Sequence, residues 1–222
     1  MTARKEPADH HPALRREEVA APQKLCVRYS PVVIQAGILC VIDRYHRHME
    51  VNAGKLGRLS VVIAVAIWTL VLVTQPMDDA GGSFLHLINL VFHEAGHIIF
   101  SPFGRFMTIL GGSLMQVLVP VVCALTLYFQ NEDLFGAALC GWWAGENLLD
   151  LAPYINDARA LNLMLLGGPA NAVEGHDWEA ILTSLGWLHL DHTLARGAHF
   201  IGASVMWAAL IWASGVTIRS RS

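Results

Sequence analysis

The sequence predicts an all-α membrane protein that crosses the lipid bilayer several times. Of its 222 residues, 54% are hydrophobic and only 15% are charged, a balance outside the range of ordinary soluble domains. Long apolar stretches alternate with short polar segments and provide about four to five candidate transmembrane helices. Ten of the fifteen Lys and Arg residues precede residue 59, as is typical of a cytoplasmic flank. We therefore expect a multi-pass protein, of the bacterial inner membrane, with a cytoplasmic N-terminus.

Residues 1–58 are expected to form a cytoplasmic basic tail followed by an interfacial helix. Residues 1–28 are charged and lack hydrophobic periodicity, and they contain no apolar core of a signal peptide. Acidic residues alternate with the basic ones, so nucleic acid is not an expected partner. Ser30 and Pro31 are typical of a helix start, but the apolar stretch that follows is too short to span a bilayer. It is expected to lie at the membrane surface.

The membrane domain, residues 59–217, contains the candidate spans. They cover residues 59–73, 84–101, 106–129, 134–152 and 199–216. Gly111 and Gly112 interrupt the third span, so its first residues are expected to form a loop or short strand before a helix from about Ser113. The turns at 75–83 and 130–133 lack Lys and Arg and are expected outside the cell.

A polar and amphipathic region, residues 161–197, separates the last two spans, and residues 218–222 form a short tail. The apolar residues of this region are spaced like one face of an amphipathic helix: Trp178, Ile181, Leu182, Leu185, Leu188 and Leu194. Such a helix would lie on the membrane surface. A small packed cap is the alternative interpretation.

Three polar side chains interrupt the apolar segment FHEAGHIIF, residues 92–100. His93 and His97 are four residues apart on one helical face, so both can offer imidazole nitrogens to one metal ion. Glu94 projects beside them and, in this HExxH arrangement, acts as general base toward water on a zinc ion. Because ionisable groups are costly in a bilayer, a functional role is expected. Histidines that hydrogen-bond within a helix bundle are the structural alternative.

The same helical face also carries His86, two turns before His93, and Asn89, one turn before it. They could line a water-accessible path to the metal or form hydrogen bonds between helices. A tetrahedral catalytic zinc needs a third protein ligand. Candidate carboxylates follow at the inner end of the fourth span, where Glu146 and Asp150 share a helical face and Asp157 lies beyond Pro153.

These motifs together resemble the site-2 protease family of intramembrane zinc metalloproteases. HEAGH is followed by LGGSLMQVLVP, residues 110–120, and NLLDLAPYINDAR, residues 147–159, over a stretch that resembles the three-helix metalloprotease core of that family, residues 84–160. The resemblance implies zinc-dependent hydrolysis of peptide bonds within or near the bilayer, with a membrane protein or peptide as substrate. The sequence departs from the family pattern where Gln116 replaces Asn, Asp150 replaces a proline, and Asp157 is displaced by two residues.

The resemblance implies that His93, His97 and Asp157 bind the metal, with Asp150, His176 or Asp177 as alternative third ligands. It implies catalytic roles for Glu94 and for Asn147, whose amide would lie near the reacting carbonyl unless it only bonds between helices. Glu146 would support a zinc histidine.

Two other functions remain compatible with the same residues. One is a zinc-dependent hydrolase that acts on a lipid-linked or small amide, and the other is a non-catalytic metal-binding membrane protein. No feature of the sequence specifies an oligomeric state.

Overall fold

The computed structural model describes residues 31–75, 83–166, 168–169 and 175–219. The expected N-terminal tail, most of the loop at 75–83 and the last residues of the C-terminal tail lie outside the described residues. The chain divides into two units, Met1–Tyr45 and His46–Ser222, and all packing discussed below belongs to the second.

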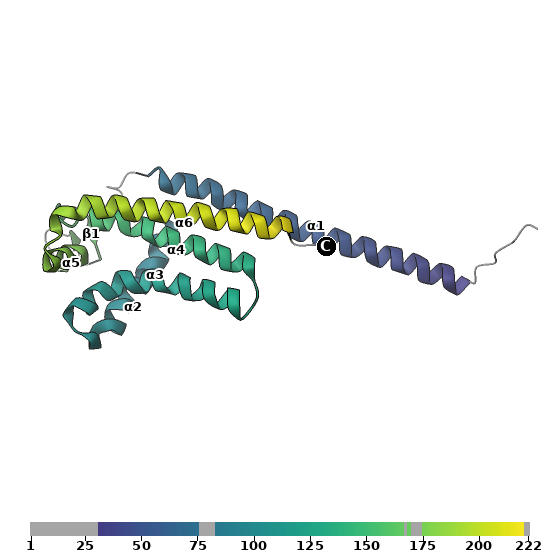
Figure 1. Ribbon diagram of the computed structural model, residues 1–222, viewed down its shortest axis with the longest axis horizontal. Coiled ribbons are helices and arrows are strands. Elements are labelled where there is room, and N and C mark those ends of the chain that lie inside the picture. The colour runs from purple at the N-terminus through teal and green to yellow at the C-terminus, as the bar shows by residue number, and fades with distance from the viewer. Residues whose placement is uncertain (1–30, 76–82, 167, 170–174, 220–222) are drawn as a thin grey trace, which may run out of the picture. The chain divides into compact units, whose positions relative to one another are not determined.

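The described residues are mostly helical, which confirms the all-α class (Figure 1). The main helices are α1 (Pro31–Val73), α2 (Phe84–Phe100), α3 (Arg105–Phe129), α4 (Leu134–Asn156), α5 (Asp177–Leu185) and α6 (Asp191–Arg219). Two single 3₁₀ turns, η1 (Ser101–Phe103) and η2 (Leu188–Leu190), join α2 to α3 and α5 to α6. A two-stranded antiparallel hairpin, β1 (Met164–Leu165) with β2 (Gly168–Pro169), follows α4.

Three of the described helices are long and apolar enough to cross a membrane. They are Ala53–Val73 at the end of α1, Arg105–Phe129, and Leu188–Arg219. These helices expose large apolar side chains, among them Ile67, Leu125 and Ile211, each more than half exposed. Apolar surface on this scale suits contact with lipid. By contrast, α2 has only 17 residues, and α4 carries a buried ionisable side chain, Glu146.

Two expected element boundaries are wrong. A separate interfacial helix near residues 31–42 was expected, but α1 continues through the charged segment to Val73. That segment contains no proline, and residues such as Arg, Lys, Met and Glu propagate a helix readily. The helix α3 begins at Arg105 rather than near Ser113. Gly104, with φ of +92°, provides the turn before it, and Gly111 and Gly112 lie inside the helix.

The helices α2 and α3 cross at two glycines, Gly96 and Gly111. A Cβ atom on Gly96 would overlap the carbonyl of Gly111, and a Cβ on Gly111 would lie 2.7 Å from the carbonyl oxygen of Gly96. Small residues at such crossings let helix backbones approach closely. The two glycines of the LGG motif therefore serve the packing of α3 against the histidine-bearing helix.

The helix α4 runs beside α6 along most of its length (Figure 1). Their interface forms an apolar core with the last turns of α1; its buried members include Val62, Leu72, Trp142, Leu149, Met206 and Leu210. The indole nitrogen of Trp142 donates a 2.8 Å hydrogen bond to the hydroxyl of Thr69, so the one polar group of this side chain is satisfied. This core fixes α4 and its carboxylates.

The region between α4 and α6 folds as a small packed cap and not as one amphipathic helix. The helix α5 packs against α3 and α4, and its side chains Ile181 and Leu182 are buried. Trp178 packs against a second cluster of Leu151, Ile155 and Ala195. This cap brings the first turn of α5 over the histidines of α2.

We predict that Gly145→Ala destabilises the helix bundle while Gly215→Ala does not. A Cβ on Gly145 would lie 2.8 Å from the carbonyl oxygen of Gly202 and 2.9 Å from Met206, so α4 and α6 must separate. The expected cost is about 1–3 kcal/mol. A Cβ on Gly215, which lies in α6, meets nothing within 4 Å. Thermal unfolding in detergent measures both, and equal melting temperatures for the two variants would contradict the observed packing.

Candidate metal centre

Three side chains from two separate helices converge on one point. The Nε2 atom of His93 lies 2.8 Å from Oδ2 of Asp177, and the Nε2 atom of His97 lies 3.2 Å from the same oxygen. His93 and Asp177 are buried, and the imidazole of His97 is about three-quarters buried. Among the described residues, this is the group of three His, Cys, Asp or Glu side chains close enough to hold a metal ion.

Both histidines are held by their other ring nitrogen. Nδ1 of His97 donates a 2.8 Å hydrogen bond to the backbone carbonyl of Thr108, and Nδ1 of His93 donates a 3.1 Å bond to Oε1 of Gln116. A carbonyl oxygen can only accept, so the imidazole proton belongs on Nδ1 in each ring. Bonds of this kind are typical of metal-binding histidines, because they orient the ring and leave Nε2 as the ligand atom.

The chemistry of the converging atoms suits a cation. With neutral imidazoles, two nitrogen lone pairs and a carboxylate oxygen face one another, an arrangement that is repulsive without positive charge between them. One divalent ion supplies that charge to all three groups. One added proton would pair a single imidazolium with Asp177 but would leave the Nε2 lone pair of the other histidine facing the same oxygen. Two imidazole nitrogens and one carboxylate oxygen form a donor set common in catalytic zinc sites. The residues present therefore fit a zinc ion.

Gly112 in α3 makes room for this arrangement. A Cβ on Gly112 would lie 2.7 Å from the Nε2 atoms of both His93 and His97. Any larger residue would have to displace the two rings from Asp177. The second glycine of the LGG motif is thus tied to the site itself, a role that the sequence alone did not indicate.

The turn before α5 fixes Asp177. His176 caps α5, and its Nδ1 accepts a 3.1 Å hydrogen bond from the backbone N–H of Glu179. Burial lowers the pKa of His176, in keeping with a neutral imidazole that can accept. The hydroxyl of Tyr154 accepts a 2.9 Å bond from the backbone N–H of Asp177, and the Tyr154 ring lies 4.4 Å from that of His176.

The charge state of Asp177 follows from its partners. Burial alone would raise its pKa, but the side-chain contacts with His93 and His97 outweigh this effect and leave the pKa below its ordinary value. The carboxylate is therefore ionised, as a metal ligand must be.

A cavity of about 620 Å³ opens beside the three side chains. Its polar lining residues include His93, His97, Asp177, Glu94, Gln116 and Asp150. The segment around the β1 strand contributes an apolar wall of Leu163, Met164, Leu165 and Leu166. Glu94 is exposed on this cavity, next in sequence to His93. The cavity thus combines polar and apolar lining residues next to the three converging side chains.

The structure places Asp157 outside the histidine cluster. Its carboxylate accepts hydrogen bonds of 2.9 and 3.0 Å from the backbone N–H groups of Asn162 and Leu163, and it lies 3.5 Å from Nε2 of His176. Asp157 therefore closes the turn after α4 and leads into β1. Asp177, one of the alternative third ligands, occupies the position beside the two histidines.

Asn147 also lies away from the cavity. It is fully buried, and its amide nitrogen donates to the carbonyl of Trp143 one turn earlier in α4. Among the described residues that line the cavity, neither Asn147 nor Asp157 is present. Tyr154, which sequence reasoning did not single out, lines it instead and contacts the ring of His93 edge-on at 6.0 Å.

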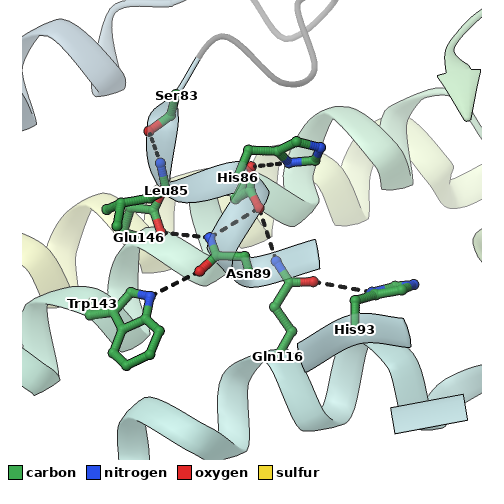
Figure 2. Close-up of polar contacts among 9 residues, drawn as sticks. Ser83, Leu85, His86, Asn89, His93, Gln116, Trp143 and Glu146 are labelled. Carbon is green, nitrogen blue, oxygen red and sulfur yellow. Dashed lines mark hydrogen bonds and ion pairs between the residues drawn. The ribbon is translucent and has the colours of Figure 1, made fainter. Parts of the chain in front are cut away.

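A buried polar network joins α2, α3 and α4 next to the site (Figure 2). Asn89 donates from its amide nitrogen to Glu146, at 2.9 Å, and to Asp150, at 3.1 Å, and accepts from the indole of Trp143. His86 pairs with Asp150 at 2.9 Å and is partly exposed at the cavity. Two roles were expected for His86 and Asn89: hydrogen bonding between helices and lining a path to the metal. Asn89 forms hydrogen bonds between helices, whereas His86 both pairs with Asp150 and lines the cavity.

Neither the protein-family models, nor the curated proteins, nor the solved structures compared with this chain gave a match. The assignment of the site therefore rests on its own geometry.

We predict that Asp177→Ala abolishes stoichiometric metal binding, whereas Asp157→Ala retains it. Asp177 supplies the carboxylate oxygen that faces both histidines. Asp157 instead accepts hydrogen bonds from the backbone after α4 and lies near His176. The measurement is metal content by elemental analysis after dialysis, with thermal unfolding to show that both variants fold. Metal lost from Asp157→Ala and kept by Asp177→Ala would restore Asp157 as the third ligand.

Proposed function

We propose that this protein is a zinc-dependent endopeptidase that cleaves membrane-associated proteins or peptides within or near the bilayer. One observation carries the proposal: the Nε2 atoms of His93 and His97 and a carboxylate oxygen of Asp177 converge, while hydrogen bonds at Nδ1 fix both rings. The likeness of HEAGH and its neighbouring segments to the site-2 protease family points to the same reaction.

Each residue at the site has a defined task. His93, His97 and Asp177 would hold the zinc ion, which when bound supplies Lewis-acid chemistry by polarising a carbonyl and making water more acidic. The carboxylate of Glu94 faces the cavity, where it takes a proton from the attacking water and delivers it to the leaving amine nitrogen. Gln116 and Thr108 keep the two imidazoles in place.

The cavity favours an extended peptide. A regular helix hides its peptide bonds behind its own side chains and backbone hydrogen bonds, so a membrane substrate must unwind before it can reach Glu94. The apolar wall formed by Leu163 to Leu166 accommodates hydrophobic side chains that leave the bilayer. An unwound segment of a transmembrane helix meets both requirements.

The membrane arrangement is part of the proposal. The three apolar helices provide spans, and α2 and α4 complete a multi-pass bundle in which α2 packs against α3 and buries its polar residues Asn89 and His93. The concentration of Lys and Arg before residue 59 favours a cytoplasmic N-terminus in a bacterial inner membrane.

The apolar wall also favours a second candidate function, hydrolysis of an amide linked to a lipid. Such a substrate would place its acyl chain against Leu163 to Leu166 and its amide near Glu94. Product analysis by mass spectrometry with a lipid panel and a single-span protein substrate separates the two functions.

We predict that Glu94→Gln keeps its zinc and loses cleavage of a single-span substrate in detergent. The amide retains the shape of the side chain but cannot take a proton, so the rate should fall by about 10²–10⁴-fold. Glu132→Gln is the matched control, because Glu132 is exposed in the turn between α3 and α4.

Turnover of Glu94→Gln at the rate of the unsubstituted protein would refute this mechanism. Equal loss of activity in Glu132→Gln would show that the assay reports surface charge or protein quality and not the site.

A further inference from the structure

The hydrogen bond between Gln116 and His93 raises a question of direction. A primary amide has a donating end and an accepting end of nearly the same shape. If Nε2 of Gln116 faced the ring, Nδ1 of His93 would have to accept, and the imidazole proton would move to the nitrogen that faces Asp177. A proton on that nitrogen would prevent it from binding a metal. The site therefore needs Gln116 in one of its two orientations.

Asp150 determines which end of the Gln116 amide faces His93. Its Oδ2 atom lies 2.9 Å from Nε2 of Gln116, and a carboxylate oxygen accepts hydrogen bonds. The amide must therefore present its N–H₂ to Asp150 and its Oε1 to His93, where the ring nitrogen lies 3.1 Å away. Gln116 is only 4% exposed, so little water can compete for either end.

Asp150 is itself held in place from α2. His86 pairs with its Oδ1 at 2.9 Å, and the amide nitrogen of Asn89 donates to its Oδ2 at 3.1 Å. Asn89 in turn is fixed by the indole of Trp143, which donates to its carbonyl oxygen. Asn89 is thus oriented by an indole that can only donate. Figure 2 shows the bonds from Asn89 to the carboxylate of Asp150, from Gln116 to the same carboxylate, and between Gln116 and His93.

We propose that Asp150 is a positioning residue for the metal centre: it orients the Gln116 amide, which keeps the proton of His93 on Nδ1 and leaves Nε2 free to bind zinc. This inference rests on the proposed function, because it assigns Asp150 a task only if His93 is a metal ligand. Asp150 acts through Gln116 and does not itself bind the ion.

The test measures zinc affinity in detergent with a competing chelator, for the unsubstituted protein and the variants named below. Asp150→Ala should weaken zinc binding by about 10–100-fold, the range found when a group that supports a metal ligand is removed. Glu146→Ala is the matched control: it removes another buried carboxylate from the same helix, one that also bonds to Asn89 but not to Gln116. It should lower thermal stability and leave zinc affinity within about twofold, well below the loss expected for a supporting group.

Rescue separates orientation from mere packing. A carboxylate has two equivalent accepting ends, so Gln116→Glu needs no group to orient it and should restore zinc affinity to Asp150→Ala. In a second comparison, Gln116→Met removes the acceptor, and adding Asp150→Ala should then cause no further loss. If Asp150→Ala does not fold, the shape-conserving Asp150→Asn replaces it, with a smaller expected loss and the same rescue.

The outcomes are distinct. Weak binding by Asp150→Ala that Gln116→Glu restores supports the inference. Unchanged affinity in a folded Asp150→Ala, or loss that Gln116→Glu leaves uncorrected, overturns it while the metal site stands. Failure of the unsubstituted protein to bind zinc overturns both this inference and the proposed function.

Discussion

The structure depends on one electrostatic constraint, the meeting of three electron-pair donors at one point inside an apolar bundle. The Nε2 atoms of His93 and His97 face a carboxylate oxygen of Asp177, and the carbonyl of Thr108 fixes the proton of His97 on the opposite side of its ring. Such a cluster is costly unless a cation occupies its centre. The position of α2 against α3, the absence of a side chain at Gly112, and the cap that carries Asp177 all serve this meeting.

A helix with buried polar groups can persist among apolar helices only if those groups are paired. On α2 the pairing is almost complete: Asn89 is bonded to Glu146, Asp150 and Trp143, and both rings of the histidine pair are bonded at Nδ1. The same bonds tie α2, α3 and α4 together. Stability of the bundle and readiness of the site therefore arise from one network, and substitutions in it should be tested for both.

The sequence predicts local features such as helices and helical faces, but it does not predict the contacts between segments far apart in the chain. Helical periodicity alone places His93 and His97 on one face, and the apolar stretches identify the helices. The third ligand was expected at Asp157 from the resemblance, whereas the structure places the carboxylate of Asp177 beside the two histidines. The reason is that α5 folds back over α2, and no local sequence pattern encodes that return. For the same reason, Gly111 and Gly112 were interpreted as a break in the helix, although they mark where α3 meets Gly96 and the histidines. The bond from His97 to Thr108 uses a backbone carbonyl, which leaves no signal in the sequence.

X-ray absorption at the zinc edge of the reconstituted protein tests the central claim most directly, because it reports the atoms bound to the ion. The account predicts one zinc per chain with two imidazole nitrogens and at least one oxygen at about 2.0–2.2 Å. A spectrum dominated by sulfur at about 2.3 Å, a zinc without imidazole, or a folded protein that takes up no stoichiometric zinc would contradict it.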